Sequence, residues 1–202
     1  MKIQTLIGFA TACLWGSQAS AHAFESGANL YAQFQEGTSV ILSYPETLLP
    51  LMTLGILLSL WTIEGLIRAW PAFLIGLVTG FPFAALIGPW IVPVILAAGI
   101  LTAALGAILN SHTKPAALGL SLVMGLLVSM VSLEGHGFLE LPFFIYAGIF
   151  FGANLVLAIS AGLTRFALEK VEAPWMRILC RVAASWIGAI LMLVLAFTLR
   201  GA

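Results

Sequence analysis

Residues 90–109, WIVPVILAAGILTAALGAIL, form a run of twenty positions without a charged side chain. A helix needs about 20 apolar residues to cross the ~30 Å hydrocarbon core of a bilayer, so this run predicts a membrane-spanning helix. Comparable apolar stretches on either side of it lie at about 46–63, 70–88, 115–133, 142–166 and 178–199. The sequence therefore predicts an all-α fold, a polytopic membrane bundle of about six helices over residues 46–202.

The composition agrees with a chain that lies in lipid. Of the 202 residues, 61% are hydrophobic and 8% are charged, whereas charged residues make up about 25% of a soluble domain. The formal net charge is zero, which gives no bulk attraction to nucleic acid. The sequence contains no Gly-x-Ser-x-Gly elbow and no His-Glu-x-x-His pair. We therefore expect the lipid bilayer as a partner, no nucleic acid and no enzymatic activity.

The first residues have the three parts of a secretory signal peptide. Lys2 supplies the positive charge, residues 6–15 form a short apolar core, and small residues follow at 19–23. We predict a signal peptide over residues 1–21, cut after Ala21 or Ala23; the alternative is an uncleaved first helix. A cleaved signal implies the cytoplasmic (inner) membrane of a bacterial cell. It places the polar segment 22–45 outside, as an external arm that leads into the first span.

The positive charges fall almost entirely on one set of alternate loops. With the mature N-terminus outside, the outer segments contain only Arg200, and the inner ones contain Arg68, Lys114, Arg165, Lys170 and Arg177, with Arg181 just inside the last span. Cytoplasmic loops of membrane proteins are enriched in Lys and Arg. This bias independently predicts that both the mature N-terminus and the C-terminus lie outside.

The outer face collects the side chains that can bind a metal ion. Glu134, His136 and Glu140 follow the fourth span, and Glu46 begins the first. Glycines flank His136 and let the backbone curl, so these groups can converge. Imidazole together with carboxylate suits first-row divalent metals, including nickel. The alternative is a solvated loop without a ligand.

His22 depends on where the signal peptide is cut. A cut after Ala21 makes it the N-terminal residue, whose amine and imidazole can chelate a transition metal. A cut after Ala23 removes it. We therefore count His22 as a metal-site candidate under the first cut only.

Small residues recur at helix-packing spacing inside the spans. Gly76 and Gly80 form one such pair, and Gly148 and Gly152 form another. Such pairs let helix backbones approach closely, which predicts a tight bundle, with a homo-oligomer face as the alternative. Asn154 is the most polar side chain within a span, and we expect an interhelical hydrogen bond for its amide.

Three stretches give the chain a resemblance to the HupE/UreJ family of small bacterial membrane proteins. They are residues 48–73, which include Arg68-Ala69-Trp70-Pro71; residues 134–142, with Glu134-Gly135-His136-Gly137; and Tyr146-Ala147-Gly148. The resemblance implies a nickel or cobalt permease with a signal peptide, about six spans and an outside C-terminus. It also implies that nickel or cobalt is a transported substrate and not a resident cofactor.

The chain departs from the family at most of the expected ligand positions. Where the family has an Asp and two His in the first span, this chain has Glu46, Thr47 and Val40. In the segment before the fifth span His136 is the one remaining His, with Glu134 near the place of another. The resemblance then implies either that carboxylates serve a different ion or that metal transport is lost.

Three hypotheses remain at this stage. The first is a permease in which Glu46, Glu134 and His136 capture a divalent metal and Glu140 assists. The second is a structural or assembly subunit of a larger membrane complex. The third is transport of a non-metal solute, with Asn154 and Glu64 near its path.

Overall fold

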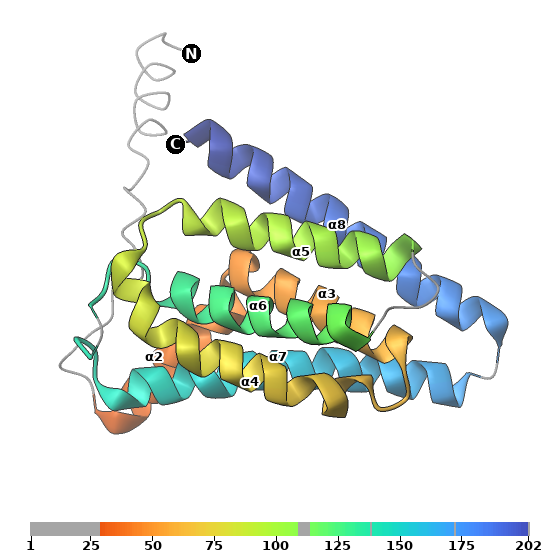
Figure 1. The fold of residues 1–202 in the computed structure, drawn as a ribbon, viewed down its shortest axis with the longest axis horizontal. Helices are drawn as coiled ribbons and strands as arrows, with labels where there is room; N and C mark the ends of the chain where they lie inside the picture. Colours follow the sequence, from red (N-terminus) through yellow and green to blue (C-terminus); the bar gives the residue numbers. More distant parts are fainter. Residues whose placement is uncertain (1–28, 109–113, 138, 172, 202) are drawn as a thin grey trace, which may run out of the picture.

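The computed structural model describes residues 29–108, 114–137, 139–171 and 173–201. Within these ranges every regular element is helical (Figure 1), in the order α2 (Leu30–Ser43), α3 (Pro45–Trp61), α4 (Gly65–Phe83), the short 3₁₀ helix η1 (Ala84–Leu86), α5 (Ile91–Ile108), α6 (Lys114–Ser132), α7 (Phe143–Lys170) and α8 (Pro174–Gly201). The predicted all-α class is confirmed. The predicted signal peptide, residues 1–21, lies outside the described residues.

The helices have the length and composition of membrane spans. Five described segments can each cross a bilayer: Gly65–Leu86, Ile91–Ile108, Lys114–Ser132, Phe143–Lys170 and Pro174–Arg200. A sixth span results if α2 and α3 are taken together as one broken helix. The chain is therefore a multi-pass integral membrane protein.

The first span differs from the expectation. The polar arm expected over 22–45 is helical from Leu30 on, and α2 meets α3 at a bend of 70°. Pro45 explains the bend, because it lacks an N–H and favours an extended residue before it; Tyr44 is extended and Pro45 opens α3. The Thr47 hydroxyl donates to carbonyls left open at the break, including that of Val40 at 3.1 Å. At about 1.5 Å per residue α3 is short of a full span by itself.

The second span also begins earlier than expected. We predicted it from residue 70, but α4 starts at Gly65. Glu64 and Arg68 form an i,i+4 ion pair at 2.8 Å across this first turn. Such pairs extend a helix into the polar region beyond the apolar stretch, which is why apolar length placed the start too late.

Glycines bring the helix backbones into direct contact, as the spacing predicted. A Cβ at Gly76 of α4 would overlap the Leu122 carbonyl of α6, and one at Gly125 of α6 would overlap the Phe73 carbonyl of α4. Gly148 of α7 lies equally close to the Phe34 carbonyl of α2. These contacts explain why α4 packs on α6 and why α2 packs along α7.

Helices α3, α5 and α7 run in one direction, and α4, α6 and α8 return (Figure 1). The α3–α4 and α7–α8 connections and the start of α6 therefore share one end of the bundle. We call it the basic end, because it carries Arg68, Lys114, Arg165, Lys170 and Arg177. The α4–α5 and α6–α7 connections form the opposite end. The structure thus places at one end of the bundle the positive charges that the sequence assigned to the inner loops.

The buried core lies among α3, α4, α6 and α7. Phe73, Leu54 and Leu77 are fully buried there. Helix α8 packs at the side against α5 and α3 and exposes most of its apolar surface (Figure 1). In a membrane such a surface faces lipid or another protein.

Candidate cation site between α3 and the α6–α7 connection

A tight turn after α6 carries two of the predicted residues. The N–H of Glu134 donates to the Val131 carbonyl at 3.2 Å, and the N–H of His136 donates to the Leu133 carbonyl at 3.0 Å. Gly135 between them has φ of 82°, a conformation that favours glycine. The turn therefore presents Glu134 and His136 together just beyond the end of the helix.

Glu46 and Glu134 come from distant parts of the sequence but lie within electrostatic range of each other. Glu46 lies in the first turn of α3, where the helix dipole favours a negative charge. Burial raises the pKa of the Glu134 carboxyl, and the negative charge of Glu46 raises this pKa further. The Glu46 charge therefore disfavours the ionised form of Glu134.

His136 and Glu140 are held by their own loop. The Nδ1 atom of His136 lies 3.2 Å from the Glu134 carbonyl oxygen. In the tautomer that donates from Nδ1, Nε2 is the nitrogen that can bind a metal ion. The Glu140 carboxylate accepts a hydrogen bond from the N–H of Gly137, which closes the 137–140 turn. Glu140 is exposed and acts here as a loop-forming residue.

The predicted ligand set is only partly assembled. Among the described residues, no group of three or more His, Cys, Asp or Glu side chains lies close enough to hold a metal ion. The structure places Glu46 within electrostatic range of Glu134, and His136 on the same turn as Glu134. His22 lies outside the described residues. The five-residue metal site therefore stays a prediction, with a carboxylate pair at its centre.

The expected hydrogen bond of Asn154 is present. Its side-chain Oδ1 accepts from the indole Nε1 of Trp70 at 2.6 Å, which links α7 to α4. Its Nδ2 donates to the Phe150 carbonyl at 2.7 Å. These two hydrogen bonds give the Asn154 amide a structural role. The sequence flagged Asn154 but gave no signal that Trp70 was its partner.

A prediction follows for the Glu46–Glu134 pair. Replacing Glu46 with Gln removes a negative charge beside Glu134, so the pKa of Glu134 should fall toward its ordinary value, while the effect of burial remains. Infrared absorption of the carboxylate as a function of pH measures this shift. Glu46→Asp, which keeps the charge, is the matched control. An unchanged pKa of Glu134 in Glu46→Gln would show that the two groups do not interact.

The raised pKa also sets the sign of a stability effect. The folded chain keeps the Glu134 proton to a higher pH than the unfolded chain does. The free energy of unfolding should therefore fall as pH rises from the ordinary glutamate pKa through the raised one. Glu134→Gln should remove that part of the pH dependence in a thermal unfolding series.

Comparisons with known proteins leave the chain to be interpreted from its own residues. No family model, no curated protein and no solved structure matches it. The fold establishes an integral membrane protein built of long apolar helices. Any statement about what it moves or binds has to rest on the polar groups that this bundle positions.

Proposed function

We propose that the chain is a permease-like protein of the HupE/UreJ kind that captures and moves a divalent metal ion such as nickel or cobalt. Glu46 and Glu134 form its central capture site, with His136 beside them. The observation that carries this proposal is that Glu46 of α3 lies within electrostatic range of Glu134 in the α6–α7 connection. The metal is the transported substrate.

The electrostatics of the pair favour a cation. Two carboxylates that repel each other in a half-buried place gain most from a positive charge between them, because Coulomb interactions strengthen as water is excluded. A divalent ion removes the mutual repulsion and replaces part of the lost hydration with carboxylate oxygens. The imidazole of His136, on the same turn as Glu134, would add a nitrogen ligand, which favours a transition metal over calcium or magnesium.

The arrangement suits entry from the outer side of a bacterial cytoplasmic membrane. The positive-inside bias assigns the basic end to the cytoplasm and the Glu134 turn to the outside. The sequence has no ATPase motif, so movement would follow an existing gradient. In this orientation both the mature N-terminus and the C-terminus lie outside.

An assembly subunit of a larger membrane complex is the second candidate. The incomplete ligand set among the described residues favours it. Helix α8 favours it as well, because only 17% of its most apolar stretch is buried inside the bundle. Most of the apolar surface of α8 can therefore contact a neighbouring protein or lipid. Comigration with a large complex after mild solubilisation would favour this candidate.

The uptake of nickel and cobalt tests the proposal. In a host without its own nickel and cobalt transport, the wild-type chain should accumulate the metal, and a Glu46→Ala, Glu134→Ala, His136→Ala variant should fall to the background of the host. Glu64→Gln is the matched control, because Glu64 is an exposed carboxylate at the basic end, paired with Arg68. It should retain wild-type uptake at equal membrane levels.

Three outcomes would count against this proposal. If neither the wild type nor any variant accumulates metal, the assembly role becomes the better account. If the triple variant accumulates as much as the wild type, the capture site lies elsewhere. Loss of metal uptake in Glu64→Gln would show that a carboxylate outside the proposed capture site is required.

A further inference from the structure

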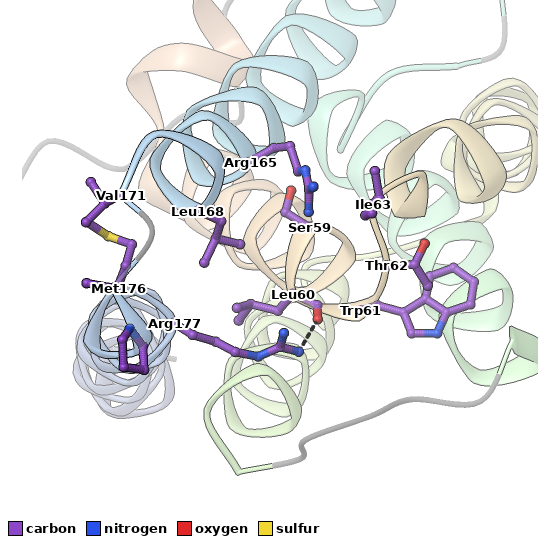
Figure 2. A pocket seen from close by; sticks show the side chains of 12 residues that line it. Ser59, Leu60, Trp61, Thr62, Ile63, Arg165, Leu168, Val171, Met176 and Arg177 are labelled. Carbon is purple, nitrogen blue, oxygen red and sulfur yellow. Dashed lines mark hydrogen bonds between the residues drawn. The ribbon is translucent and has the colours of Figure 1, made fainter.

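A separate cavity opens at the basic end, away from the carboxylate pair. Its volume is about 550 Å³, and its wall is formed where α3 ends and where α7 meets α8 (Figure 2). This size falls within the range of small-molecule sites. Its polar lining includes Arg165, Arg177 and Thr62, and its apolar lining includes Leu60, Leu168 and Met176. The cavity is therefore amphipathic, with two guanidinium groups beside an apolar wall.

The two arginines differ in how their charge is balanced. Arg165 pairs with Glu169 on its own helix, at 2.6 Å from Nε to the carboxylate. Arg177 donates from Nη2 to the Leu60 carbonyl at 2.7 Å, and no carboxylate of the described residues forms an ion pair with it. Figure 2 shows Arg165 extending from α7 and Arg177 from α8 toward the segment that carries Leu60 and Thr62. Among the described residues, the side chains that line the cavity and their ion-pair partners thus carry a net positive charge.

Thr62 also contributes to the lining, but its hydroxyl oxygen is buried beneath the surface of the cavity. The complementarity of the wall to an oxygen-rich anion therefore rests on the arginine charges, above all on that of Arg177, which forms no ion pair within the described residues.

The position of the cavity identifies the kind of anion. It lies at the ends of the spans, with Trp61 in its lining and the exposed Trp175 beside its residues Pro174 and Met176. Tryptophan is enriched at the level of the lipid headgroups. Arginine binds phosphate oxygens in bidentate fashion. A ligand with a phosphate group and an attached apolar chain would match both walls.

We propose that this cavity at the basic end binds the phosphate headgroup of an anionic phospholipid, with Arg177 and Arg165 on the phosphate and Leu60, Leu168 and Met176 against the start of the acyl chains. Basic pockets between transmembrane helices on the cytoplasmic side are suited to such headgroups. A free phosphate ion shares the headgroup chemistry but leaves the apolar wall unused. The site is independent of the carboxylate pair and of metal transport.

The test uses the full purified chain in an uncharged detergent. Native mass spectrometry counts bound lipid as dioleoyl-phosphatidylglycerol or dioleoyl-phosphatidylcholine is titrated in. We expect one phosphatidylglycerol molecule to bind about tenfold more tightly than phosphatidylcholine, and Arg165→Gln, Arg177→Gln together to remove this preference. The control is Arg68→Gln with Lys170→Gln, which removes the same charge from the same end without touching the cavity wall. It should keep the preference.

A second variant separates binding from folding. Arg177→Lys keeps the charge and a donor for the Leu60 carbonyl but loses the planar two-donor fork, so phosphatidylglycerol should bind more weakly than to the wild type and still more tightly than phosphatidylcholine. The proposal is overturned if the wild type binds both lipids equally, if the double Gln variant keeps its preference, or if the Arg68 and Lys170 control loses as much. Displacement of phosphatidylglycerol by millimolar inorganic phosphate would show that the cavity binds a free anion, and it would overturn the proposal of a lipid site.

Discussion

Gly125→Ala is expected to lower the free energy of unfolding by about 2–3 kcal/mol, although alanine is the better helix former. A Cβ at this position of α6 would overlap the Phe73 carbonyl and press on the Leu77 nitrogen, both of which belong to the backbone of α4. A flexible side chain could move away at little cost, but backbone atoms move only if the two helices separate. Separation would loosen the α4–α6 contact along its whole length.

Gly119→Ala is the matched control for this prediction. Gly119 lies on the same helix, and a Cβ there would have no neighbour within 4 Å. The substitution should therefore be neutral or stabilise the chain by up to about 1 kcal/mol, the ordinary gain in helix propensity. Unfolding of the purified chain in mixed micelles measures both variants. Equal stabilities for the two variants would show that the α4–α6 backbones are not in contact.

The glycine contacts also show how much of the fold the sequence could predict. Apolar length located the later spans to within a few residues, and the spacing of Gly76 with Gly80 predicted a close-packed face. The partner helix could not be read from that spacing, because the same pattern suits a neighbouring helix and a second copy of the chain. Helix α2 was missed because its Gln, Ser and Gly residues lower its hydropathy, although packing on α7 supports it.

For the candidate sites, too, the sequence could predict what depends on neighbouring residues but not what depends on the packing of helices. Glu134 and His136 are two residues apart, so the sequence alone placed them on one turn. The interaction of Glu134 with Glu46 depends on how α3 packs beside α6, and no local sequence pattern predicts that packing. The cavity with Arg165 and Arg177 could not be predicted from the sequence, because its wall comes from three helix ends that meet only in the folded bundle.

Phe73→Ala is expected to cost about 3 kcal/mol of unfolding free energy, whereas Phe197→Ala should change it by less than about 0.5 kcal/mol. The Phe73 side chain is 0% exposed between α4 and its neighbours, and that of Phe197 is 65% exposed on α8. In a bilayer the apolar surroundings are similar in both places, so transfer from water does not distinguish them. Packing does, because lipid fills the space left at Phe197 and nothing fills the space left at Phe73.

The pair of phenylalanine variants thus separates two sources of stability in the bundle. If the cost follows burial among protein side chains, Phe73→Ala unfolds first in mixed micelles and α8 tolerates truncation along its lipid face. Equal costs at both positions would mean that Phe197 is covered by protein in the membrane. Within the described part of the chain Phe197 is 65% exposed, so a native gel of the wild-type chain would then test whether a second copy or another subunit supplies the cover, which would appear as a larger particle.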